Sequence, residues 1–291
     1  MHVLLATDGS DDARKATTWL RDLPLPPQST IRVLGVAPRP HLALDIPQVR
    51  EFNQAQLQMT RDEAEKARAL LGQQHQAETR VVEGEPRETI VREAYDWPAD
   101  LTVVGARGLG AVGRFLLGSV STAVLHGVPG AVAVVRGTPQ RPRLVLVACD
   151  GSAHAFDAIR FLRSLPLGRD TTVRLLGVVT PLAVPAAAPE MLALPWPPTD
   201  AAFIEEQKSA VNEVLAKAEA ELGSEIGSVE RSVVVGYPAS EILTAAEAGG
   251  FDLLVVGARG LGTVGRLVLG SVSDRVVHHA PCTVLVVKGK A

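Results

Sequence analysis

Two glycine-rich segments of the sequence have residue types and a spacing that suit the binding of phosphate groups. In the first segment, Gly105 is followed by Gly108 and then, after nine residues, by Gly118 and Ser119. Glycine lets the backbone turn tightly and brings main-chain N–H groups close to phosphate oxygens. The free N–H groups and the dipole at a helix start attract anions, and a serine hydroxyl there can bond a phosphate oxygen or a metal-bound water. The second segment has the same pattern at Gly257, Gly260, Gly270 and Ser271.

Two other interpretations of the first loop fit less well. Residues 108–113 match a dinucleotide-binding fingerprint, but that motif belongs after the first strand of a unit and needs an acidic residue about 20 positions later. Residues 120–135 contain no Asp or Glu. Residues 113–119 match a nucleotide-binding P-loop that lacks its lysine, and with it the charge that reaches the terminal phosphates.

The glycine loops are part of a repeat that covers nearly the whole chain. Residues 105–121 and 257–273 are identical at fourteen of seventeen positions, at an offset of 152. Near the start of each copy, the segment 4–10 matches 146–152 at an offset of 142, so the second copy carries ten extra residues. These ten residues fall most naturally in the Pro/Ala-rich stretch 181–198. The joint, 136–142, is short, polar and rich in Pro and Gly, as linkers between domains are.

Each copy alternates between apolar runs and helical patterns. In the first copy, residues 3–7, 31–37, 79–82, 101–104 and 131–135 are expected to form strands. Helices are expected from Ser10, over 48–71, over 86–95 and over 118–126. Strands that alternate with helices predict a mostly parallel sheet covered on both faces, so each copy is expected to be a doubly wound five-stranded α/β unit. Ligands bind such sheets beyond the carboxyl ends of the strands, where Asp8, Val36 and Gly105 are expected.

The paired loops resemble those of the universal stress proteins in their tandem form. The resemblance covers both copies, and in that family the same glycine spacing marks the ATP-binding branch. It implies a strand order of 3-2-1-4-5 in each domain and an adenine nucleotide, ATP with accompanying Mg²⁺, as the ligand. It also implies a contact between the two fifth strands, 131–135 and 283–287, about a pseudo-twofold axis. The domains are expected over residues 1–138 and 143–291.

The resemblance also implies roles for side chains outside the glycine loops. Asp8 and Asp150 would contact the ribose or the metal, and Val36 and Val178 would offer backbone groups to the adenine edge. Arg107, Arg114 and Arg259 flank the loops and could supply countercharge.

Simpler interpretations stay open for several of these residues. The glycines could only permit packing of the loop on the sheet, and the two arginines near the first loop could be solvated surface charges. Ser119 could be a plain helix N-cap, and Asp8 could be only a turn residue before the first helix. His126, His278 and His279 lie near helix carboxyl ends, where such residues are favourable without any zinc site. Cys149 is expected to be buried and inert.

Composition narrows the range of partners. A net charge of -3 argues against a nucleic-acid footprint, and 4% aromatic residues argue against a base-stacking surface. Two cysteines, a start without a signal peptide and no long apolar helix favour a reduced, cytoplasmic setting without membrane contact. A homo-oligomer, for instance a dimer, and an unknown protein partner are also expected.

Three functions remain open at this point. The first is an ATP-binding stress-response regulator or sensor with little or no catalysis. The second is a slow Mg²⁺-dependent ATPase, and the third is a scaffold that binds protein partners. The loop carries no lysine and no evident base, which argues against fast hydrolysis. The segment 181–198 is expected to cover the second site or to form an interface.

Overall fold

The strands and helices of the first half of the chain follow one another in strict alternation. The computed structural model describes all residues except 39–46, 74, 109–116, 182–200, 262–268 and 290–291. The first half comprises β1 (His2–Thr7), α1 (Asp11–Asp22), β2 (Thr30–Ala37), α2 (Pro47–Leu71), β3 (Gln76–Glu83), α3 (Pro86–Asp96), β4 (Leu101–Gly105), α4 (Ser119–Gly127) and β5 (Ala131–Val135).

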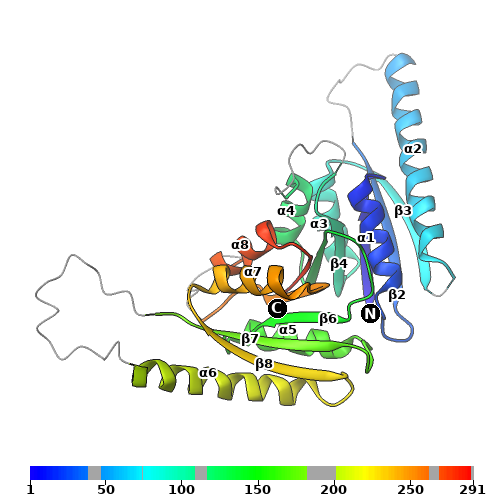
Figure 1. The fold of residues 1–291 in the computed structure, drawn as a ribbon. Coiled ribbons are helices and arrows are strands. Elements are labelled where there is room, and N and C mark those ends of the chain that lie inside the picture. The colour runs from blue at the N-terminus through cyan, green and yellow to red at the C-terminus, as the bar shows by residue number, and fades with distance from the viewer. Residues whose placement is uncertain (39–46, 74, 109–116, 182–200, 262–268, 290–291) are drawn as a thin grey trace, which may run out of the picture.

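The second half repeats this order of elements. It comprises β6 (Leu144–Ala148), α5 (Ala153–Ser164), β7 (Thr172–Val179), α6 (Ala201–Leu222), β8 (Ser228–Val235), α7 (Pro238–Gly249), β9 (Leu253–Gly257), α8 (Ser271–His279) and β10 (Thr283–Val287). Helix α2 and helix α6 lie at opposite outer ends of the molecule (Figure 1).

All ten strands form one sheet, in the order β3-β2-β1-β4-β5-β10-β9-β6-β7-β8. Each half therefore has the expected order 3-2-1-4-5, with parallel pairing throughout. The two halves meet where β5 pairs with β10 in antiparallel fashion. The expected contact between the fifth strands is thus confirmed, and it lies within one chain.

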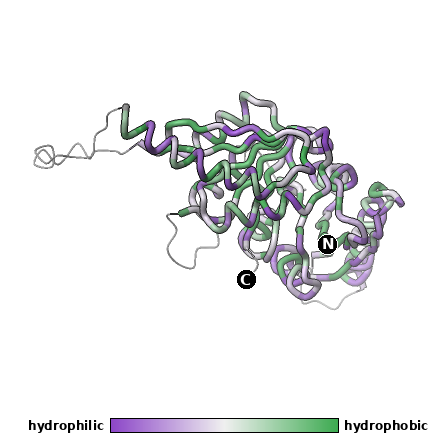
Figure 2. The backbone as a smooth tube through the Cα atoms, turned by 90° about the horizontal axis from the view of Figure 1, so that it is seen from below, coloured by the Kyte–Doolittle hydropathy of each residue, from purple (hydrophilic) through white to green (hydrophobic). Residues whose placement is uncertain are grey.

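Two hydrophobic cores lie on the two faces of this sheet, and each extends through both halves. On one face, α1, α2, α5 and α6 cover the strands with residues such as Trp19, Leu71 and Leu215. On the other face, α3, α4, α7 and α8 contribute residues such as Leu125 and Val276. Figure 2 shows hydrophobic segments running through the middle of the molecule.

The burial of each strand follows its place in the sheet. The central strands β4, β5 and β10 are buried at every residue, as expected for strands covered on both faces. The edge strands β3 and β8 contain no buried residue, and exposed and half-buried residues alternate along most of β3. The doubly wound α/β fold expected from the sequence is therefore confirmed.

Two local details differ from the expectations, and one expectation falls on residues that the structure does not describe. Helix α4 begins at Ser119, with Gly118 as its N-cap, so the interpretation of Ser119 as the N-cap is wrong. One of the ten extra residues lies in the connection between α6 and β8, which is 223–227 against 72–75 in the first half. The segment proposed to cover the second site, 181–198, lies outside the described residues except for Pro181. No described helix is long and apolar enough to span a lipid bilayer.

Candidate functional site

A cavity lies at the carboxyl edge of the sheet in each half. Cavity one, in the first half, has a volume of about 370 Å³, and cavity two, in the second half, has about 480 Å³. Both volumes fall within the range of small-molecule sites, about 300–1,000 Å³. Cavity one is lined by Ala6, Thr7, Asp8, Ala13, Leu34, Val36, Pro38, Gln56, Met59, Thr60, Glu63, Pro86, Ile90, Val104, Gly105, Arg107, Gly108, Val120 and Ser121. Cavity two is lined by Ala148, Cys149, Asp150, Ala155, Leu176, Val178, Thr180, Val211, Val214, Pro238, Ile242, Val256, Gly257, Arg259, Gly260, Leu261, Gly270, Ser271, Val272 and Ser273.

The turn after β1 places Asp8 at the mouth of cavity one. The Asp8 Oδ1 atom accepts a hydrogen bond from the Ser10 N–H at 3.0 Å, and Gly9 has a φ of +74°, a region that favours glycine. Ser10 is the N-cap of α1, and its Oγ accepts from the Ala13 N–H at 3.2 Å. Asp8 therefore acts as the turn residue, which the simpler interpretation also expected. The second half repeats this turn at Asp150 and Ser152.

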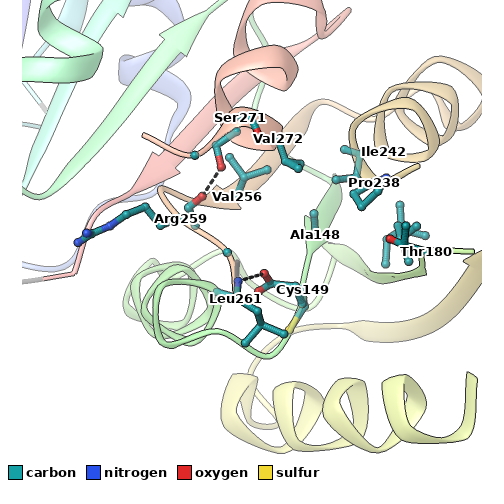
Figure 3. A pocket seen from close by; sticks show the side chains of 18 of the residues that line it. Ala148, Cys149, Thr180, Pro238, Ile242, Val256, Arg259, Leu261, Ser271 and Val272 are labelled. Carbon is teal, nitrogen blue, oxygen red and sulfur yellow. Dashed lines mark hydrogen bonds between the residues drawn. The ribbon is translucent and has the colours of Figure 1, made fainter. Parts of the chain in front are cut away.

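The same carboxylates contact the glycine loops. A Cβ at Gly108 would lie 2.5 Å from Asp8 Oδ2, so the loop backbone passes directly beside this carboxylate. A Cβ at Gly260 would meet Asp150 Oδ2 in the same way. Asp150 Oδ2 also accepts a hydrogen bond from the Leu261 N–H at 3.0 Å (Figure 3). Each aspartate therefore joins the first turn of its half to the loop after the fourth strand.

Gly105 and Gly257 are required by packing. A Cβ at Gly105 would lie 2.6 Å from the backbone carbonyl of Asp12, and a Cβ at Gly257 would lie 2.6 Å from that of His154. The first turn of α1 or α5 therefore sits directly on the end of the fourth strand of its half. For these two glycines the packing interpretation holds, because the close approach of the helix backbone excludes any side chain.

The N-terminus of α4 closes back onto the end of β4. The Gly118 N–H donates to the Ala106 carbonyl at 2.8 Å, and the Ser121 Oγ donates to the Gly105 carbonyl at 2.7 Å. The corresponding distances in the second half, at Gly270 and Ser273, are both 2.7 Å.

With these bonds in place, the start of each helix lies at the cavity of its half. Gly270 and Ser271 line cavity two, and Val120 and Ser121 line cavity one. The first N–H groups of a helix have no partner within the helix, so both cavities border a site that attracts anions.

Val36 and Val178 lie in β2 and β7, one residue before the carboxyl end of each strand. The Leu176 carbonyl accepts a bond from the Cys149 N–H at 2.9 Å, so the main-chain groups of Leu176 face β6. Main-chain groups alternate in direction along a strand, so those of Val178 face the same side. The pairing of β6 with β7 ends at Ala148 and Leu176, which leaves Val178 facing cavity two. Val36 has the matching position in cavity one, since pairing of β1 with β2 ends at Gly35.

Two of the three arginines that were expected to supply countercharge, Arg107 and Arg259, are held by other side chains. The Arg107 Nε donates to Asp12 Oδ2 at 2.9 Å. Burial of Asp12 opposes its ionisation, but hydrogen bonds from Arg107 and Lys15 outweigh that effect and lower its pKa. The Arg259 Nε donates to His154 Nε2 at 3.0 Å, and the Arg259 side chain points away from cavity two (Figure 3). Arg114 lies outside the described residues.

Several residues that line the cavities were not anticipated from the sequence. Helix α2 contributes Gln56, Met59, Thr60 and Glu63 to cavity one, and no local pattern in the sequence indicates this role. The repeated pattern Ser-Val-Ser at 119–121 and 271–273 was a signal for the buried serines, which hold the loops closed.

The other candidates have structural contacts. His126 Nε2 lies 3.6 Å from Asp274 Oδ1, and His278 Nδ1 lies 2.8 Å from the Asp274 carbonyl. The first contact joins α4 to α8 of the other half, and the second lies within α8. Cys149 and Cys282 are both buried, and burial raises the pKa of both thiols.

Comparison with known proteins gives one consistent result. The family model described as "Universal stress protein family" matches residues 1–136 and again residues 142–288. A universal stress protein of Mycolicibacterium smegmatis is 32% identical over 314 aligned residues, which cover 98% of this chain and 96% of that protein. A universal stress protein of Thermus aquaticus is 34% identical over 148 residues, which cover 50% of this chain and 98% of that protein.

Solved structures agree on the fold. A universal stress protein from Archaeoglobus fulgidus matches with a TM-score of 0.65 at 22% identity, over 99% of this chain and 98% of that one. A protein of unknown function from Pseudomonas aeruginosa matches with a TM-score of 0.61 at 14% identity, over 99% and 92% of the two chains. The chain therefore belongs to the universal stress protein family, as a tandem of two copies.

Proposed function

We propose that the chain binds adenine nucleotides, with ATP and its accompanying Mg²⁺ as the ligand, and acts as a stress-response regulator or sensor. The observation that carries this proposal is the presence of the same cavity, bordered by the same loop and helix start, in both halves. A crevice without a function would not be expected to keep fourteen of seventeen loop residues identical between the two copies.

The chemistry of the cavities fits the two ends of a nucleotide. The starts of α4 and α8 offer N–H groups to the phosphates, and Ser119 and Ser271 are exposed there. At the other end, Val36 and Val178 present main-chain groups among apolar residues, an environment that suits a purine base. Asp8 and Asp150 lie between these two ends, where a ribose or a metal ion would sit.

Catalysis is proposed to be slow or absent. The described residues that line the cavities include no lysine, so the charge that reaches the terminal phosphates in P-loop enzymes has no counterpart among them. A slow Mg²⁺-dependent ATPase is the second candidate, favoured by one observation. Glu63 lines cavity one together with Asp8, and two carboxylates are suitable ligands for Mg²⁺.

The test of the proposal starts from the purified protein. Mass spectrometry after denaturation should detect a co-purified adenine nucleotide, and calorimetry should detect binding of Mg-ATP. The double variant Gly118→Ala with Gly270→Ala should lose binding without unfolding, because added methyl groups block the approach to the helix starts. Absence of both released nucleotide and Mg-ATP binding in the unmodified protein would contradict the proposal. Phosphate release measured in the same preparation decides between the regulator and the slow ATPase.

A regulatory role needs a signal from the bound nucleotide. We propose that ATP stabilises the chain or changes its shape, in a cytoplasmic setting, and that whole chains self-associate or bind a protein partner. Melting temperature and light scattering, each measured with and without Mg-ATP, test these points. Identical values in both states would argue for a scaffold whose partners are independent of nucleotide.

A further inference from the structure

The two cavities differ at one wall, where helix α2 of the first half corresponds to helix α6 of the second. A Cβ at Gly9 would meet the Glu63 side chain, whereas a Cβ at the equivalent Gly151 would meet Val214. One helical turn earlier, Gly35 faces Thr60 and the equivalent Gly177 faces Val211. Glu63 and Val214 therefore occupy the same structural position, as do Thr60 and Val211.

Glu63 brings a second carboxylate to cavity one. It packs over Gly9, the residue that follows Asp8, and Glu63 and Asp8 both line the cavity. Its charge is partly offset by Lys66, with Nζ 2.7 Å from Oε1, and by Arg14, with Nη1 3.9 Å from Oε2. Those two cations are the more exposed partners, at 71% and 57% against 31% for Glu63, so solvent and salt screen them more strongly.

The side chain that pairs with the arginine beside each glycine loop also differs in charge between the two halves. Beside cavity one, the Asp12 carboxylate pairs with Arg107, so it offsets the positive charge of this arginine. In the second half, His154 stands where Asp12 stands in the first, and its Nε2 accepts the bond from Arg259. An imidazole carries no negative charge whether or not it is protonated, so the second half lacks the carboxylate that Asp12 provides in the first. Asp157, 3.7 Å from His154 Nδ1, is itself paired with Arg160.

We propose that Glu63 makes the two cavities unequal: cavity two is the stronger site for a free nucleotide polyphosphate, and cavity one selects ligands with less negative charge. This inference deepens the proposed nucleotide function and rests on it. A like charge next to a bound anion weakens its binding, and the apolar Val211 and Val214 impose no such cost in cavity two. Mg²⁺ neutralises part of the triphosphate charge, so the inequality shrinks when the ligand is Mg-ATP.

Calorimetry of the full chain with ATP in the presence of EDTA tests this inference. The unmodified protein should show two classes of site that differ by about tenfold in Kd, the size of effect expected for a nearby like charge. Glu63→Val, which copies the residue of the second half, should merge them into one class at the tighter value. Glu63→Gln keeps the shape and removes only the charge, so it should have nearly the same effect. The reciprocal Val214→Glu should weaken the tight class, and adenosine should bind all variants with unchanged affinity.

The outcomes separate this inference from the nucleotide proposal. Two equal sites in the unmodified protein, or unequal sites that Glu63→Gln leaves unchanged, would overturn the role of Glu63 while nucleotide binding stands. A lack of any binding by ATP, AMP or adenosine would overturn the nucleotide function, and this inference with it. Melting curves identify a variant that fails to fold, and the isosteric Glu63→Gln then replaces Glu63→Val as the decisive variant.

Discussion

Ala133 of β5 lies directly opposite Leu285 of β10, and the two residues occupy equivalent positions in the two copies. The pairs on either side, Val132 with Val286 and Val134 with Val284, are symmetric about this point. The pseudo-twofold axis of the molecule therefore passes between Ala133 and Leu285. The contact between the two fifth strands that the family resemblance implied is therefore made within the chain, as expected.

This symmetry predicts how the separate halves behave. If the proposed domains 1–138 and 143–291 are expressed alone, each exposes a strand that is buried at every residue, a strong template for pairing. Mixed fragments should form a heterodimer in preference to either homodimer, because small Ala133 opposite large Leu285 fills the space that two leucines would overfill. Light scattering of each fragment and of the mixture measures this. Folded fragments that stay monomeric when mixed at micromolar concentration would contradict it.

Lys288 and Arg136 make equivalent hydrogen bonds across the contact between the two halves. Each follows the fifth strand of its own half, and each reaches the carboxyl end of a helix in the other half. The Lys288 Nζ donates to the Val128 carbonyl at 2.6 Å, and the Arg136 Nη1 donates to the His278 carbonyl at 2.9 Å. A cation at a helix carboxyl end interacts favourably with the helix dipole. Burial nevertheless lowers the pKa of Lys288 to about 8.

The lowered pKa predicts a specific dependence of stability on pH. Between the native pKa of about 8 and the unfolded value of 10.5, the unfolded chain binds more protons at Lys288 than the native chain does. The contribution of this group to the free energy of unfolding therefore rises with pH across that window, by on the order of 1–3 kcal/mol. Urea unfolding from pH 7.5 to 10 measures the rise, and Lys288→Met should flatten it relative to the unmodified protein. The same slope in both proteins would show that Lys288 is not the group responsible.

Much of the fold could be predicted from the pattern of the sequence. The buried apolar runs, the Pro at 86 and the Asp-Gly-Ser turn all give local signals, and the internal repeat doubled each of them. The strand order within each half came from the family resemblance, since apolar runs alone do not say which strands are neighbours.

The cavity wall could not be predicted in this way. Glu63 and Thr60 lie on a helix whose charges resemble those of any solvated surface, and only the packing of α2 over the turn after β1 brings them to the cavity. The hydrogen-bond partner of Arg107 could not be predicted either. Asp12 precedes Arg107 by 95 positions, and only the parallel sheet brings the two residues together. Contacts of this kind depend on the tertiary fold and leave no local pattern.

The glycines of the loop should separate into two kinds when replaced. Gly105→Ala puts a Cβ 2.6 Å from the Asp12 backbone, so it should destabilise the chain by about 1–3 kcal/mol. Gly118→Ala meets nothing closer than 3.4 Å, so it should change stability by less than about 1 kcal/mol and mainly reduce nucleotide affinity. Thermal unfolding and Mg-ATP calorimetry on both variants measure the two effects. A stable Gly105→Ala variant would show that α1 can move away from β4.

The two cysteines should be unreactive in the native chain at neutral pH. Desolvation raises the pKa of Cys282 to about 12 and also raises that of Cys149, so neither is present as a thiolate in quantity. A thiol reagent at pH 7.5 should therefore label both residues only slowly, and should label both quickly in denaturant, which serves as the control. Cys149 lines cavity two, so bound nucleotide should slow its labelling further and leave Cys282 unaffected. Rapid labelling of Cys149 in the native chain, unchanged by Mg-ATP, would show that cavity two opens freely to solvent and is not the nucleotide site.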